Sequence, residues 1–172
     1  MLPQIKRILY ATDLSDNSAF VFRYAINSAK HHDAGMTILH VLEKISPTTE
    51  TLIRTYLSEE DYKELFSDKV HFAMERNRKR LEIFCEKELK DGPKGAKRVE
   101  AIEICEGFPA DEILQKADEL SCDAIIMGTH GKGIISQTFL GSTAKRVLRR
   151  TRKPVFIIPM PKGDIDITFH GI

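Results

Sequence analysis

Five short apolar segments recur along the chain, and a helical pattern separates most of them from the next. They are rich in Ile, Val and Leu and lie at residues 5–11, 36–42, 99–105, 124–127 and 155–158. Parallel strands cannot be joined by a tight turn, so strands that alternate with helices are typical of parallel sheets with crossover helices. The alternation therefore predicts an α/β fold, a three-layer, open, five-stranded parallel sheet with helices on both faces.

Helical periodicity fills the longer intervals between these segments. The expected helices run from about 17 to 34, from about 58 onward, from about 109 to 120 and from about 142 to 150. Ser15 or Asp16 could cap the first helix, Ser58 the second, and Pro109 suits the first turn of the third. Residues 43–57 contain Pro47 and several threonines, which favour a loop that could include a short helical turn. DGPKGAK at 91–97 has the composition of a second loop.

Length and charge limit the possible classes of protein. The chain has 172 residues, which predicts one domain over 1–160, with an insertion at about 43–69 and a tail at 161–172. Its 26 Lys and Arg nearly balance 25 Asp and Glu, so no overall field attracts nucleic acid or a membrane. The three cysteines lie far apart and predict free thiols in a reducing compartment. With neither a signal peptide nor a long apolar run in the sequence, we expect a soluble, cytoplasmic protein.

Glycines gather in MGTHGKGIISQTFLGSTAKRV, residues 127–147. The Walker A loop requires Lys after its second glycine, but Ile134 follows Gly133. The dinucleotide motif requires a third glycine where Ser136 stands, and it should follow the first strand. A phospho-acceptor signalling domain would need Asp at the end of the third strand, where the sequence has Glu106 and Gly107. These three phosphate-handling motifs are excluded.

The remaining spacing is Gly128-x2-Gly131-x9-Gly141-Ser142-Thr143. The last three residues open a predicted helix, whose free N–H groups and positive end favour an anion. A flexible glycine loop with Ser142 as an ordinary N-cap is the alternative. Asp13, Val41 and Gly128 follow or end predicted strands, so we expect them to share one site at the carboxyl edge of the sheet. Asp13 could instead be a turn residue without a ligand.

This spacing, after the run DAIIMGTHG, resembles the nucleotide-binding signature of the universal stress protein family. Further segments fit the same family: KRILYATDLS, ILHVLE, GFPADEIL and KPVFIIP. The match covers nearly the whole chain except residues 43–69 and the tail. The resemblance implies a Rossmann-like fold similar to that of the adenine nucleotide alpha hydrolases. It also implies membership of the subset of the family that binds ATP.

The resemblance also implies a ligand set. Asp13 would hold the ribose or the adenine edge, the Val41 backbone would bind adenine, and the glycine loop would hold the ribose and phosphates. The implied binding residues are Ala11, Thr12, Asp13, Val41, Met127, Gly128, His130, Gly131, Gly141, Ser142 and Thr143. The bound nucleotide could be ATP, ADP or AMP, with Mg²⁺ or Mn²⁺ bridging its phosphates. A homodimer through the strand at 155–158 is implied as well, and an apolar edge strand there would favour it.

Three functions are compatible with these features. The first is an ATP-binding regulatory or stress-response module. The second is a slow ATPase or adenine-nucleotide hydrolase, although the loop after the first strand reads ATDLSDNS and lacks the Ser-Gly-Gly-x-Asp-Ser pattern of pyrophosphatase-type relatives. The third is a nucleotide-independent dimer that binds an unknown protein through residues 43–69. We identify no catalytic residue, since no nucleophile–base pair or metal-ligand cluster is evident, and His130 has no obvious carboxylate to orient it. We expect no nucleic-acid binding, because the basic residues from Lys145 to Lys153 lack neighbouring aromatic side chains.

Overall fold

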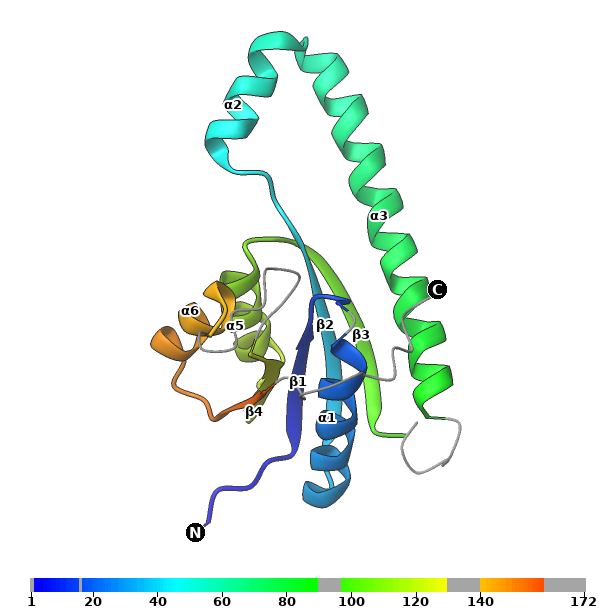
Figure 1. Ribbon diagram of the computed structural model, residues 1–172, viewed down its shortest axis with the longest axis vertical. Helices are drawn as coiled ribbons and strands as arrows, with labels where there is room; N and C mark the ends of the chain where they lie inside the picture. Colours follow the sequence, from blue (N-terminus) through cyan, green and yellow to red (C-terminus); the bar gives the residue numbers. More distant parts are fainter. Residues whose placement is uncertain (1, 16, 90–96, 130–139, 160–172) are drawn as a thin grey trace.

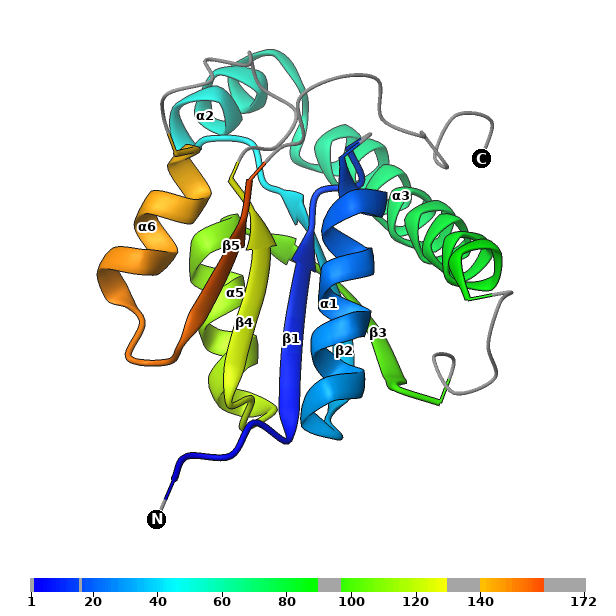
Figure 2. The same ribbon diagram turned by 60° about the horizontal axis from the view of Figure 1, so that its bottom comes forward.

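The computed structural model describes residues 2–15, 17–89, 97–129 and 140–159. It contains a five-stranded parallel sheet in the order β3-β2-β1-β4-β5 (Figures 1 and 2). The strands are β1 (Arg7–Thr12), β2 (Gly35–Glu43), β3 (Val99–Gly107), β4 (Ala124–Gly128) and β5 (Val155–Ile158). The predicted fold class is confirmed, and each predicted strand is present to within two residues at either end.

The sheet is covered on both faces, which explains why its strands are almost continuously apolar. Successive residues of a strand point to opposite faces, so Ile8 and Tyr10 of β1 enter one core while Leu9 and Ala11 enter the other. Helices α1 (Ser18–His32) and α3 (Glu59–Glu88) cover the first face. Helices α5 (Pro109–Glu119) and α6 (Ser142–Arg150) cover the second (Figure 2).

The helix starts agree with the sequence except at α1. Ser58 caps α3 by accepting a hydrogen bond from the N–H of Asp61 at 3.1 Å, and Pro109 occupies the first turn of α5. The N-cap of α1 is Asn17, whose side chain makes no capping hydrogen bond, so the prediction that Ser15 caps this helix is wrong. Ser15 contributes its carbonyl oxygen instead, which accepts from the N–H of Ser18 at 2.9 Å. Asp16, the other predicted cap, lies outside the described residues.

Residues 47–56 form a complete helix, α2 (Pro47–Tyr56), where the sequence favoured a loop. Its start is well specified, because Pro47 occupies the first turn and Ser46 accepts a hydrogen bond from the N–H of Thr49 at 3.2 Å. None of its residues is buried. An apolar stripe facing a core is the main sequence signal for a helix, and α2 has no core to face.

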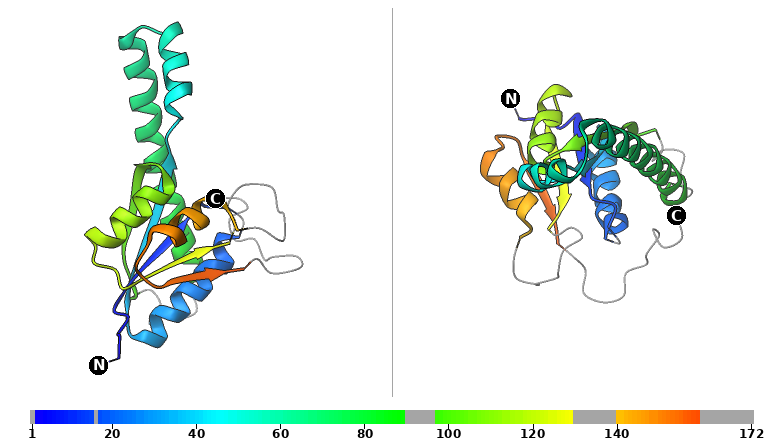
Figure 3. Two further views of the ribbon diagram at one scale, coloured as in Figure 1. Left: turned by 90° about the vertical axis from the view of Figure 1, so that its left-hand side faces the viewer. Right: turned by 90° about the horizontal axis from the view of Figure 1, so that it is seen from above.

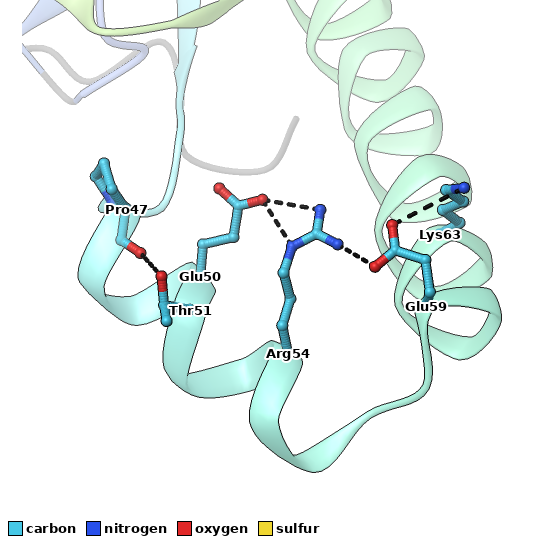
Figure 4. Close-up of polar contacts among 6 residues, drawn as sticks. All are labelled: Pro47, Glu50, Thr51, Arg54, Glu59 and Lys63. Carbon is cyan, nitrogen blue, oxygen red and sulfur yellow. Dashed lines mark hydrogen bonds and ion pairs between the residues drawn. The ribbon is translucent and has the colours of Figure 1, made fainter.

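Helix α2 and the first half of α3 form an arm, defined here as residues 47–72, that stands clear of the sheet (Figures 1 and 3). Arg54 joins its two helices. Its guanidinium donates to Glu50 of α2 at 3.0 Å and binds Glu59 of α3 (Figure 4). It also lies 3.9 Å from the ring centroid of Tyr62. Leu52, Tyr56 and Phe72 remain largely exposed on this arm. The arm is thus held at its tip by polar contacts rather than by a core.

The remaining predictions concern the edge of the sheet, the loop at 91–97 and the C-terminal tail. Strand β5 lies at one edge of the described sheet, next to β4, as predicted. The predicted tail at 161–172 and the predicted loop at 91–97, apart from Lys97, lie outside the described residues. In the described part of the chain, no helix combines the length and the apolar character needed to cross a membrane.

Candidate functional site

A cleft of about 550 Å³ opens at the carboxyl edge of the sheet. The ends of β2, β1 and β4 form its floor, and residues from α3, α5 and α6 line its walls. The chain adds β2 and β3 on one side of β1 and then returns to place β4 on the other side. The cleft therefore lies at the switch in strand order, where ligands bind in open α/β sheets. Its volume is within the range of about 300–1,000 Å³ that is typical of small-molecule sites.

Most of the residues implied by the sequence signature line this one cleft. They are Ala11, Thr12 and Asp13 from β1 and its end, Val41 from β2, Met127 and Gly128 from β4, and Gly141, Ser142 and Thr143 at the start of α6. His130 and Gly131 lie outside the described residues. The expectation that Asp13, Val41 and Gly128 come together is thus met by the geometry of the strand ends.

Asp13 begins a tight turn directly after β1. Its Oδ1 accepts hydrogen bonds from the N–H of Ser15 at 3.1 Å and from the hydroxyl of Ser18 at 3.5 Å. Its Oδ2 is buried and has no hydrogen-bond partner among the described residues. The next residue, Leu14, has a φ of 58°, a backbone conformation that residues other than glycine rarely adopt. Asp13 is therefore a turn residue that also keeps one acceptor unsatisfied in the cleft, and such groups are costly unless something binds them.

The start of α6 forms the opposite end of the cleft. Gly141 is the N-cap, and its N–H donates to the carbonyl of Thr129 at 2.8 Å, which fixes the helix start against the end of β4. No acidic residue occupies the first turn, and no side chain caps it in the described part of the chain. The alternative that Ser142 is the N-cap is wrong, because Ser142 is the first helical residue. The first-turn N–H groups and the positive helix end thus border the cleft.

A buried polar chain that the sequence analysis missed crosses the cleft floor. His40 of β2 and Asn77 of α3 are 3% and 5% exposed. The Nδ1 of His40 lies 2.9 Å from the carbonyl oxygen of Thr12, so Nδ1 must be the donor. The Nε2 of His40 then accepts from the amide of Asn77 at 3.2 Å. These contacts join β1, β2 and α3 beneath the cleft and indicate a neutral imidazole with its proton on Nδ1.

Several other lining residues were also missed. They include Arg76 and Arg80 of α3, Leu42 and Glu43 at the end of β2, Thr129 after β4, and Pro109 and Ile113 of α5. Asn77 could have been found, since it falls at helical spacing between Ala73 and Leu81 in the apolar stripe of α3. No such signal marks the two arginines, because charged residues are frequent along most of this long helix.

The described residues include neither a metal-ligand cluster nor a cysteine with a lowered pKa. No group of three or more His, Cys, Asp or Glu among them is arranged to hold a metal ion. Burial raises the pKa of the Cys85 thiol to about 12 and, together with Glu112, raises the pKa of the Cys105 thiol to about 11. Both are therefore protonated at neutral pH, whereas a nucleophilic cysteine requires the thiolate. The unsatisfied Oδ2 of Asp13 and the uncapped start of α6 suit a ligand that carries both hydroxyl groups and an anionic group.

Comparisons of sequence and of structure with known proteins all lead to the same protein family. The model of the universal stress protein family matches residues 4–159. The chain is 32% identical over 159 residues to the universal stress protein MJ0531 of Methanocaldococcus jannaschii, which covers 92% of this chain and 85% of that protein. It is similar to the solved structure of MJ0577 from the same organism, with a TM-score of 0.69, 25% identity and coverage of 94% of this chain and 100% of the other. A universal stress protein crystallised in complex with cAMP shares the fold, with a TM-score of 0.50, 20% identity and coverage of 91% and 98%.

Proposed function

The chain belongs to the universal stress protein family, and from this premise we propose that its cleft binds ATP and that the protein acts as a nucleotide-dependent regulatory module. The observation that carries the proposal is the unsatisfied Oδ2 of Asp13, which lies in the same cleft as the uncapped start of α6. A nucleotide complements both features, because its ribose hydroxyls donate hydrogen bonds and its phosphates accept them. The family resemblance assigns the same two roles to these residues.

The end of β2 supports a place for the adenine. The pairing of β1 with β2 ends at Thr12 and His40, whereas β2 continues alongside β3 as far as Glu43. Residues 41–43 therefore extend past the end of β1, and Val41 lines the cleft there. Backbone groups at such an extension can bind the edge of a base, and the apolar side chains of Val41 and Ile113, which both line the cleft, suit its faces.

A divalent cation fits the proposal as a partner of the nucleotide. Ser142 and Thr143, beside the proposed phosphates, offer hydroxyl oxygen atoms, and oxygen is the ligand type that Mg²⁺ and Mn²⁺ prefer. No metal-binding cluster exists among the described residues, so the phosphates themselves would supply most of the ligands. The cation would neutralise phosphate charge.

Replacing Asp13 tests the proposal. We expect Asp13→Ala to weaken ATP binding by about 10- to 100-fold, because one charge-assisted hydrogen bond contributes about 1.5–3 kcal/mol. Isothermal titration of nucleotide-free protein with ATP and Mg²⁺ measures the change. Asp118→Ala is the control, since Asp118 lies in the last turns of α5, 77% exposed and outside the cleft lining. Equal affinity of the Asp13 variant and the wild type would contradict the role of this carboxylate.

We also propose that two copies associate through β5. This strand lies at the sheet edge, and Phe156 is 38% exposed on it. An apolar edge strand pairs readily with another copy, and the family resemblance implies this dimer. Light scattering should therefore give twice the chain mass of 19.6 kDa, and Phe156→Asp should reduce it to that of one chain. A wild-type mass of one chain at micromolar concentration would contradict the dimer.

The exposed arm supports the alternative function, that of a protein-binding module. Leu52, Tyr56 and Phe72 are 59%, 81% and 66% exposed there. The test compares the binding of a partner protein to the wild type and to a variant that no longer binds nucleotide. Equal binding to both would favour this alternative over nucleotide-dependent regulation.

A further inference from the structure

The cleft has positive groups at two separate places. The start of α6 is one, on the face of the sheet covered by α5 and α6. Arg76 and Arg80 are the other, on α3, which packs on the opposite face (Figure 2). The carboxyl ends of β2 and β1, including Asp13, lie between them. The proposed nucleotide uses the first place for its phosphates and does not involve the second.

Helix α3 is fixed at the level of the cleft. Asn77 is buried and donates to His40 of β2, so the helix can neither rotate nor slide here without breaking a buried hydrogen bond. Arg76 and Arg80 are four residues apart and lie on the same side of the helix. The basic residues between them do not line the cleft. Arg78 donates to the carbonyl of Ile102 on β3 at 2.7 Å, and Lys79 is exposed and outside the cleft lining.

The arginines are close to where the ribose is expected. Neighbouring strands are about 4.8 Å apart, so the end of β2, where α3 is anchored, is one strand spacing from the end of β1. Asp13, at the end of β1, accepts hydrogen bonds from Ser15 and Ser18. A phosphate attached to one ribose hydroxyl would thus lie on the α3 side of the ribose, while the other hydroxyl would still donate to Asp13. Guanidinium groups bind phosphate with two parallel hydrogen bonds, which makes arginine the side chain best suited to this position.

We propose that Arg76 and Arg80 form a second anion-binding group and that the cleft prefers adenine nucleotides with an additional phosphate on the ribose. Adenosine 3′,5′-bisphosphate represents this ligand class. The inference rests on the proposed function, because it places the base and the 5′-phosphate as described above. It adds a selectivity between nucleotides that differ only at the ribose.

The test compares AMP with adenosine 3′,5′-bisphosphate by isothermal titration of the wild type and of single variants. We expect the bisphosphate to bind at least about tenfold more tightly than AMP to the wild type. Arg76→Ala and Arg80→Ala should each reduce this ratio severalfold and leave the affinity for AMP within about threefold. Lys79→Ala, on the same turn of α3, should leave both affinities unchanged. Arg80→Lys should retain part of the ratio, because a lysine keeps the charge but forms no paired hydrogen bonds.

The outcomes separate the two proposals. A ratio near one in the wild type, with AMP and ATP both bound, would overturn the second anion group and leave the proposed function intact. Arginine variants that weaken both ligands equally, or that melt at a lower temperature with an unchanged ratio, would assign these side chains a structural role and overturn the inference. Failure of all three nucleotides to bind would overturn both proposals.

Discussion

Gly141→Leu is expected to weaken ATP binding by more than about 100-fold while the protein stays folded. Gly141 is the N-cap of α6 and lines the cleft where the phosphates are proposed to lie. A leucine side chain would occupy that volume and separate the phosphates from the first-turn N–H groups. Loss of two hydrogen bonds to a charged group, each contributing about 1.5–3 kcal/mol, exceeds 100-fold in affinity.

The fold should tolerate this change. The φ and ψ of Gly141 are −58° and 157°, which any residue can adopt, and its N–H can still donate to Thr129. Leucine is a poorer N-cap than glycine, so the free energy of unfolding should fall by only about 1 kcal/mol. Gly141→Ser is the matched control, because serine caps well and is small. A folded leucine variant that binds ATP within threefold of wild type would show that the start of α6 does not hold the phosphates.

Phe22→Ala should lower the free energy of unfolding by about 3–5 kcal/mol, the usual cost of removing a large buried aromatic side chain. Phe22 of α1 is fully buried, and its ring centroid lies 5.8 Å from that of Tyr10 on β1 and 5.0 Å from that of Phe84 on α3. It therefore connects both helices of the first face to the sheet. Domains of this size are stable by about 5–15 kcal/mol, so the loss is a large part of the total.

Urea denaturation followed by circular dichroism measures this loss. Phe20→Ala is the control on the same helix, because Phe20 is only partly buried and its ring contacts Tyr24 at a centroid distance of 5.1 Å. The free energy of unfolding of Phe20→Ala should fall by no more than about 1 kcal/mol. Similar losses for the two variants would contradict the assignment of Phe22 to the centre of the core.

The sequence predicts the sheet well because its strands carry their own signal. Segments such as Ala124–Met127 are apolar on both faces, and Pro109 and Ser58 mark helix starts that the structure reproduces. Helix α2 was missed for the opposite reason. Its stabilising contacts are the cap at Ser46 and the ion pairs of Arg54 with Glu50 and Glu59, none of which produces an apolar periodicity.

The site is predictable where it depends on strand ends and on the start of α6. Asp13 and Gly128 follow from the rule that parallel strands present their carboxyl ends to a shared edge. Of the α3 residues that line the cleft, Asn77 interrupts the apolar stripe of the helix, but Arg76 and Arg80 follow from no local pattern. The length of the arm decides which turn of this 30-residue helix reaches the strand ends, and Arg76, Asn77 and Arg80 are there for that reason. Long-range geometry of this kind produces no pattern among residues that are close in the sequence.

The central claim is that the cleft at the switch point binds ATP. Isothermal titration of the purified protein, unfolded and refolded to remove any bound nucleotide, with ATP in the presence of Mg²⁺ tests it most directly. The account predicts saturable binding of one nucleotide per chain with a dissociation constant in the micromolar range. Absence of binding at millimolar ATP to a protein with native circular dichroism would contradict it.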